Sequence, residues 1–254
     1  MKIITAVLSF TLILLAFASC KKDKSNNTTD TPILTGDSIL YRIKKNSVII
    51  SEYTYNFDHT VKTITYYNDA GNFSSSCAFT YNQSARISRV DNVYSDAANN
   101  SNDSYVYNSG NLLITINDYC GAVQEFTQTL QYDSVNRLES LWFYYGGGMF
   151  GTNFIYGSAN HVVKEYDSGD LVCDTTYYVY DNQKNIKIKG LARMSPDVLS
   201  ANNIIQQTHN DQSGNPKPSD SYSSVFEFNS NGLPTKETRT YLNSTVDVYE
   251  YIYY

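Results

Sequence analysis

The stretch YDSVNRLESLWFYY, residues 132–145, carries the pattern that decides the fold. Tyr132 and Asp133 precede a short turn, and Arg137 and Leu138 then open a second run that is rich in aromatic residues. Asn and Asp favour turns because their side chains bond to nearby backbone groups and because they tolerate left-handed backbone conformations. The stretch therefore predicts a β-hairpin in which Tyr132 ends one strand and Leu138 begins the next.

The same pattern recurs along most of the chain. The spacings between successive central aromatic residues are 26, 26, 25, 24, 24 and 48, and we interpret the last as two periods with one degenerate unit. Gly157 replaces the usual Asn or Asp once, which loosens the predicted turn there. The central aromatic residues are Tyr55, Tyr81, Tyr107, Tyr132, Tyr156, Tyr180 and Phe228. Six residues after the first six of these, an aliphatic residue is expected to start the return strand: Val61, Ile87, Leu113, Leu138, Val162 and Ile186.

Repeated hairpins of this kind predict an all-β fold. Both rings of an aromatic-x-aromatic pair lie on one face of a strand, because side chains alternate along it. Each unit of about 25 residues should supply two strands, and consecutive units should pair edge to edge. We therefore expect residues 37–254 to form an antiparallel meander of about 14–16 strands, curled into a half-pipe or barrel whose concave side is filled by the repeat tyrosines.

The N-terminus has the features of a targeting segment. Lys2 is followed by a long apolar run, as in a signal peptide. Ala18 and Ser19, directly before Cys20, resemble a bacterial lipobox. The resemblance implies that residues 1–19 are removed and that Cys20 is acylated, which would anchor the protein lastingly in the outer membrane. Residues 20–36 would then be a flexible tether, and the leaflet that the domain faces stays open. An ordinary cleaved signal peptide is the alternative.

The repeat units resemble the YD repeats of Rhs-type proteins, and YDSVNRL at 132–138 is the closest copy. From about residue 40 onward, the chain also resembles a Bacteroidetes lipoprotein family of unknown function with a porin-like β-fold. This likeness lies in Asn202-Asn203, after a short helical insertion, and in the turn at residues 231–234. It implies a fold and a compartment but no settled activity. Residues 190–203, where Pro196 could open a helix, are expected to plug one end of the sheet or cover an edge.

Composition and cysteine usage argue against several function classes. The formal net charge is −6, and no cluster of Lys and Arg could neutralise a row of phosphates, so we expect no nucleic-acid partner. Beyond Cys20 the cysteines have no Cys-x-x-Cys spacing, so we expect no metal site. We interpret them as small buried residues, with one oxidised pair as the alternative. They are Cys77, Cys120 and Cys173.

No catalytic constellation is visible in the sequence, and we expect neither an enzyme nor a cofactor. The histidines are scattered, and two of them fall in or beside predicted turns; they are His59, His161 and His209. Asp167 and Asp170 could be glycosidase-like carboxylates or calcium ligands, but we interpret them as turn residues.

The most unusual local feature is LWFYYGGGMFG at residues 141–151, which contains the single tryptophan. Trp142, Tyr144 and Tyr145 are candidate binding aromatics, a platform for stacking a sugar ring or a peptide beside a glycine loop. The alternative is a central strand with both faces covered and a flexible hairpin loop.

Taken together, these patterns predict an outer-membrane-anchored lipoprotein with a non-enzymatic binding or structural role at the cell envelope. A glycan or an envelope protein would be the partner. Two alternatives stay open: an integral outer-membrane barrel, as the aromatic last strand suggests, and a hydrolase acting on glycans. Against the integral barrel, the strands lack a regular outward apolar band.

Overall fold

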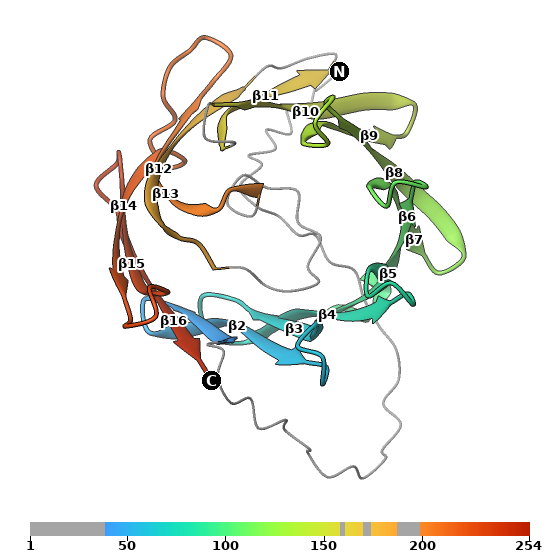
Figure 1. Ribbon diagram of the computed structural model, residues 1–254, viewed down its shortest axis with the longest axis horizontal. Coiled ribbons are helices and arrows are strands. Elements are labelled where there is room, and N and C mark those ends of the chain that lie inside the picture. Colours follow the sequence, from blue (N-terminus) through green and yellow to red (C-terminus); the bar gives the residue numbers. More distant parts are fainter. Residues whose placement is uncertain (1–38, 158–160, 170–173, 187–198) are drawn as a thin grey trace, which may run out of the picture.

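The strands form one closed barrel in the computed structural model, which describes residues 39–157, 161–169, 174–186 and 199–254 (Figure 1). A short 3₁₀ helix, η1 (Ala97–Asn99), precedes β6. The strands are β1 (Leu40–Lys45), β2 (Val48–Tyr55), β3 (Val61–Tyr67), β4 (Phe73–Tyr81), β5 (Ile87–Tyr94), β6 (Ser101–Tyr107), β7 (Leu113–Cys120), β8 (Val123–Tyr132), β9 (Leu138–Tyr145), β10 (Gly148–Tyr156), β11 (Val162–Gly169), β12 (Thr175–Lys184), β13 (Asn202–Asn210), β14 (Tyr222–Phe228), β15 (Pro234–Tyr241) and β16 (Val246–Tyr253).

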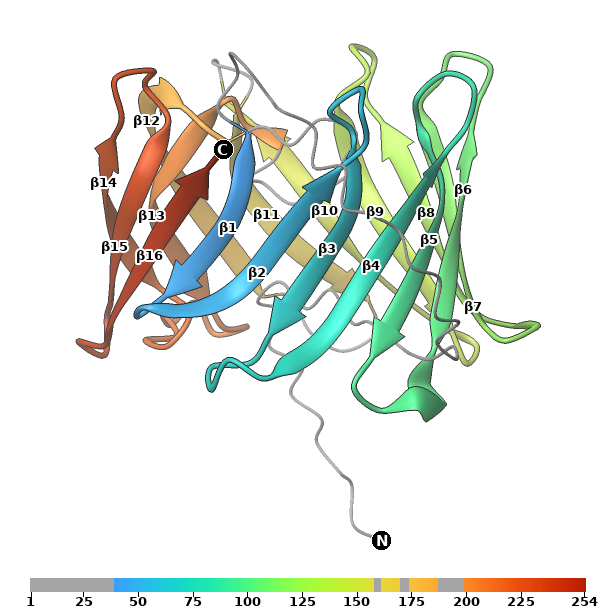
Figure 2. The same ribbon diagram turned by 90° about the horizontal axis from the view of Figure 1, so that it is seen from below.

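Every strand pairs antiparallel with its neighbours in sequence, and β1 pairs with β16 to close the barrel. Figure 2 shows β1 and β16 side by side, with the strands tilted relative to the barrel axis. The predicted all-β meander is confirmed, and the sheet closes completely instead of ending as a half-pipe. Closure gives the two end strands a partner on each side, which removes the sheet edges.

The opening stretch folds as the sequence predicts. Asp133 Oδ1 accepts hydrogen bonds from the backbone N–H groups of Val135 and Arg137, both at 2.9 Å. Asn136 takes a left-handed conformation with φ of 64°, and the Arg137 guanidinium returns to Asp133 Oδ2 at 2.7 Å. Leu138 then starts β9 with its side chain buried. The aspartate therefore satisfies the turn's donors, which explains why Asn or Asp follows the aromatic residue.

Two other repeat turns are built in the same way. Asn82 and Asn229 each accept two backbone N–H bonds, two and four residues on. His59 has a left-handed φ of 66°, as expected for a turn residue. At Gly157 the side-chain acceptor is missing, but the backbone bond from Gly157 N–H to the His161 carbonyl is kept at 2.9 Å. The closing backbone bond of the hairpin is thus kept without the side-chain acceptor.

The prediction of a degenerate unit between Tyr180 and Phe228 is wrong. Asp181 keeps both bonds of the repeat turn, but the second donor is the N–H of Asn203 at 3.0 Å, far along the chain. Ile204 then pairs with Tyr180, as Leu138 pairs with Tyr132. The long spacing is therefore one unit with an insertion inside its turn.

Ile186 consequently does not start a return strand, because β12 runs on to Lys184 and β13 begins at Asn202. The predicted plug at residues 190–203 lies mostly outside the described residues.

An eighth unit, which the repeat count missed, is formed by the last and first strands. Tyr253 at the end of β16 pairs with Leu40 at the start of β1, like an aromatic residue with its aliphatic partner. Tyr254 N–H donates to the Ile39 carbonyl at 3.0 Å, which is the bond that closes the turns of six other units. The two ends of the sheet are joined by the same interactions as the hairpins.

Tyrosine hydroxyl groups tie the hairpins together around one end of the barrel. In seven of the eight units, the central tyrosine donates to the backbone carbonyl of the first residue in the preceding unit's return strand, at 2.6–2.9 Å. Each of these carbonyls lies where the strand register shifts, so the hydroxyl supplies a bond beside an interrupted ladder. Phe228 occupies the eighth position and has no hydroxyl. The donors and acceptors are Tyr55 to Leu40, Tyr81 to Val61, Tyr107 to Ile87, Tyr132 to Leu113, Tyr156 to Leu138, Tyr180 to Val162 and Tyr253 to Pro234.

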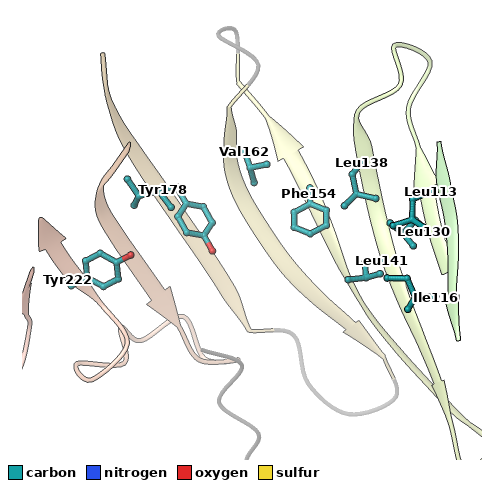
Figure 3. Packing of buried hydrophobic residues seen from close by; sticks show 10 residues of the cluster. Leu113, Ile116, Leu130, Leu138, Leu141, Phe154, Val162, Tyr178 and Tyr222 are labelled. Carbon is teal, nitrogen blue, oxygen red and sulfur yellow. The ribbon is translucent and has the colours of Figure 1, made fainter. Parts of the chain in front are cut away.

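The apolar core lies on the inner wall of the barrel. Ile186, which follows β12, packs against the buried cluster of β1–β3, although β13–β16 separate these strands along the sheet. That contact crosses the interior, so the buried face is the inner one. Figure 3 shows the largest cluster, to which β7–β14 contribute side chains. Repeat tyrosines pack against these clusters, in agreement with their predicted place on the concave side.

Candidate functional site: the inner wall

The inner wall changes from apolar to polar along the barrel axis. The row next to the repeat turns pairs an aromatic residue with an aliphatic one, for example Tyr132 with Leu138. The second row is largely apolar, as in Leu130 with Leu141. The third row is polar in five of the eight hairpins, and we call these five register pairs the polar belt. They are Cys77 with Asn92, Asp103 with Asp118, Thr152 with Asp167, Thr176 with His209 and Ser224 with Arg239.

Asp103 and Asp118 form a carboxyl pair in the belt. They lie directly opposite each other on β6 and β7, and their side chains hydrogen-bond to one another. Burial raises the pKa of Asp103 to about 7, and the charge of Asp118 adds to the effect. Burial also raises the pKa of Asp118. The pair therefore holds a shared proton in the acidic to neutral range.

A chain of neutral groups leads to this pair from β4. The Cys77 thiol donates to Asn92 Oδ1 at 3.3 Å, and Asn92 Nδ2 donates to Asp103 Oδ2 and to Ser101 Oγ, both at 3.1 Å. Cys77 is fully buried, and burial raises the pKa of its thiol to about 12. A thiol held in this form is a hydrogen-bond donor and not a nucleophile.

A second polar group lies on β10–β13. Asp167 accepts a hydrogen bond from Thr152 Oγ1 at 2.9 Å, and burial raises its pKa. His209 Nδ1 lies 2.8 Å from Thr176 Oγ1, and its Nε2 lies 3.5 Å from Asp174. Asp167 is thus part of a strand and not a turn residue, which corrects the sequence interpretation; Asp170 lies outside the described residues.

Arg239 is the cationic member of the belt. Its guanidinium pairs with the buried Glu237 at 2.8 Å, and its Cζ lies 4.1 Å from the ring centroid of Tyr222 and 4.8 Å from that of Tyr249. Glu237 also accepts a bond from Ser224 Oγ at 2.6 Å. The ion pair and the two rings hold the guanidinium in one position.

Three belt pairs combine a buried side chain with a partly exposed one. Asp118, Thr176 and Ser224 are buried. Their partners keep some exposure at the interior surface: Asp103, His209 and Arg239. The belt therefore presents fixed acidic, basic and aromatic groups toward the interior. Sequence reasoning missed this belt, because its pairs form across strands.

The outer wall has the opposite character over much of its circumference. Outward-facing side chains of β14–β16, β1, β2 and β5 include four ion pairs that lie on the strands themselves. Lys236 Nζ, for example, lies 2.7 Å from Glu227 Oε1. A Lys or Arg facing the middle of a lipid bilayer costs about 2–4 kcal/mol. The pairs are Arg42 with Glu52, Lys44 with Glu250, Arg89 with Asp91 and Lys236 with Glu227.

The predicted aromatic platform is only partly assembled. Trp142 lies on the outer wall, with its Nε1 donating to Ser140 Oγ at 3.0 Å and its ring against the backbone of Gly151. Tyr144 shares that wall, whereas Tyr145 has the opposite parity at the hairpin end; both are exposed. β9 and β10 form the predicted hairpin, but its outer face is exposed and not covered, and Trp142 and Tyr144 face outward together.

The remaining predicted positions are spread over the barrel. Cys77 and Cys120 are free thiols, while Cys20 and Cys173 lie outside the described residues. His161 follows the turn at Gly157 and stacks on Tyr180 at 4.8 Å between ring centroids. Across the described part of the chain, no group of three or more His, Cys, Asp or Glu side chains could hold a metal ion. The same residues contain no helix that is long and apolar enough to cross a membrane.

Comparison with solved structures supports the architecture. The chain is similar to a porin-like protein from Bacteroides uniformis, with a TM-score of 0.57 and 11% identity over 85% of this chain and 98% of that one. It is also similar to a porin-like protein from Bacteroides vulgatus, with a TM-score of 0.56 and 8% identity over 86% and 99%. No protein-family model and no curated protein matches the sequence. The likeness shows a porin-like barrel fold; the lipid anchor and the YD-repeat resemblance stay predictions.

Proposed function

We propose that this protein is a lipid-anchored barrel of the outer membrane that does not cross the bilayer, whose charged outer strands face water and whose inner wall binds a ligand without catalysis. Cys20 would carry the lipid, and residues 20–36 would be the tether. The observation that carries the proposal is the distribution of polarity. Aromatic and aliphatic side chains line the inside, and ion pairs lie on the strands outside. A barrel embedded in lipid needs the reverse arrangement.

A glycan is the ligand class that fits the inner wall best. Sugars present apolar ring faces that stack on aromatic side chains and hydroxyl groups that need several hydrogen-bond partners. The inner wall offers tyrosines beside Asp103, His209 and Arg239, each held by a fixed neighbour. A protein segment rich in Tyr, Ser and Asn would present similar groups, and a binding screen should contain both.

The lipid anchor and the water-facing wall can be tested in one series. Cells expressing the full chain with a C-terminal tag should incorporate labelled palmitate, and Cys20→Ala should abolish the label. The chain lacking residues 1–19, with Cys20→Ala, should stay monodisperse in buffer without detergent. Protease treatment of intact cells would then place the tag outside or inside the outer membrane. Label that persists in Cys20→Ala, or aggregation without detergent, would contradict the proposal.

The second candidate is a barrel that spans the outer membrane. It is favoured by the porin-like fold of the two solved neighbours, each of which is matched over nearly its whole length. The porin-like fold taken alone agrees better with a barrel that spans the membrane than with a lipoprotein that binds a ligand. The candidate requires lipid around the ion pairs of β14–β16 and β1. A detergent requirement for folding, together with ion conductance in planar bilayers, would establish it.

A further inference from the structure

One side of the outer wall differs from the rest. Between Ser140 and Val163, the sequence contains no Asp, Glu, Lys or Arg, and this stretch supplies β10 and most of β9. Its outward side chains join those of β11 and β12 in what we call the aromatic face. The exposed fractions of its most exposed side chains lie between 36% and 48%. The aromatic face consists of Trp142, Tyr144, Met149, Ile155, Val163, Tyr166, Tyr177 and Val179, with Lys164 among them.

The face is continuous across neighbouring strands. Ile155 on β10 pairs with Lys164 on β11, which pairs with Tyr177 on β12, so the three side chains form one outward row. Val163 and Val179 lie beside this row, toward the repeat turns. β9, β10, β11 and β12 follow one another along the barrel wall (Figure 1). An exposed apolar surface of this continuity marks a contact site.

Lys164 indicates what the face contacts. Its Nζ lies 5.6 Å from the ring centroid of Tyr166 and 5.5 Å from that of Tyr177, so the ammonium group stands over aromatic rings. Tyrosine, tryptophan and lysine side chains that lie together are typical of the boundary between lipid headgroups and acyl chains. In a chain of net charge −6, a cation at this place favours an anionic partner surface.

We propose that the aromatic face rests on the surface of a phospholipid bilayer, so that the barrel contacts the membrane on one side without crossing it. The inference deepens the proposed function, since the anchor at Cys20 would hold the barrel close to lipid. A second copy of the chain fits less well. A two-fold contact through the face would bring two Lys164 ammonium groups together with no carboxylate on the face to neutralise them.

The test uses the chain from residue 20 with Cys20→Ala, so that its outcome is independent of lipidation. Flotation with vesicles of phosphatidylethanolamine and phosphatidylglycerol should carry the protein upward. The double variant Ile155→Thr, Tyr177→Thr should lower partitioning about tenfold, because threonine keeps strand propensity but removes apolar contact area. Lys164→Gln should lower it about fivefold on these vesicles and leave partitioning to phosphatidylcholine vesicles unchanged. Val225→Thr, at an exposed position on β14, is the matched control.

Two results would overturn the inference. The first is a wild-type chain that stays unbound to both kinds of vesicle, or that floats equally well with and without the Ile155 and Tyr177 substitutions. The second is sedimentation that shows a dimer abolished by the same double variant, which would assign the face to a second copy. Thermal unfolding of each variant shows whether the barrel is intact, because these side chains lie outside its core.

Discussion

The repeat tyrosines form a circle of hydroxyl-to-carbonyl bonds around one end of the barrel. Removing one of these hydroxyl groups tests how the hairpins are held together. In Tyr132→Phe the aromatic ring stays against the core, and the bond of 2.7 Å to the Leu113 carbonyl is lost. That carbonyl sits where the register of β6 and β7 shifts, so the regular ladder does not replace the bond. A hydrogen bond of this kind contributes about 1 kcal/mol, and an unsatisfied buried carbonyl brings the cost to about 1–3 kcal/mol.

The assay for Tyr132→Phe is thermal and chemical unfolding of the chain without residues 1–19. For a domain of this size, 1 kcal/mol corresponds to about 2–4 °C in Tm. The matched control is Tyr144→Phe, because Tyr144 is exposed on the outer wall and no hydroxyl bond ties it to a neighbouring hairpin among the described residues. Equal unfolding free energies of wild type and Tyr132→Phe would refute the reasoning, as would an equal loss in the control.

Three further predictions follow from the belt, the wall and the repeat. The raised pKa values of Asp103 and Asp118 make the native state bind more protons than the unfolded state between about pH 4 and about pH 7, so the unfolding free energy of the wild type should fall as the pH rises through this range. In Asp103→Asn this fall should be smaller. Unfolding measured at several pH values with the same slope as the wild type would contradict this. Gly151→Ala should cost about 1–3 kcal/mol and shift the emission of Trp142, because an added Cβ would lie 2.6 Å from its ring; unchanged fluorescence and Tm would count against the close contact. Phe228→Tyr should raise the unfolding free energy by about 1 kcal/mol, because the new hydroxyl group would supply the missing eighth bond to a carbonyl of the preceding unit. A lower Tm would show that this position cannot form the bond.

The sequence located most of the candidate site's surroundings but not the site itself. The turns and return strands followed from Asx residues and period-two alternation, because both act over a few neighbouring residues. The predicted starts at Val61, Ile87, Leu113, Leu138 and Val162 all coincide with strand starts. The belt pairs join residues on different strands, and Asp174 meets His209 only because β12 and β13 are paired after a long insertion. Local patterns carry no signal for such contacts.

By itself, the sequence determined the hairpins, their repeat and the alternation of two faces, because each of these depends on turn chemistry and strand geometry within one unit. Only the tertiary structure decided that the sheet closes, because closure requires the last strand and the first to meet in register. It also showed that Tyr253 and Leu40 complete an eighth unit and that the long spacing after Tyr180 is an insertion. Closure also joins the two alternating faces into one continuous inner wall and one continuous outer wall.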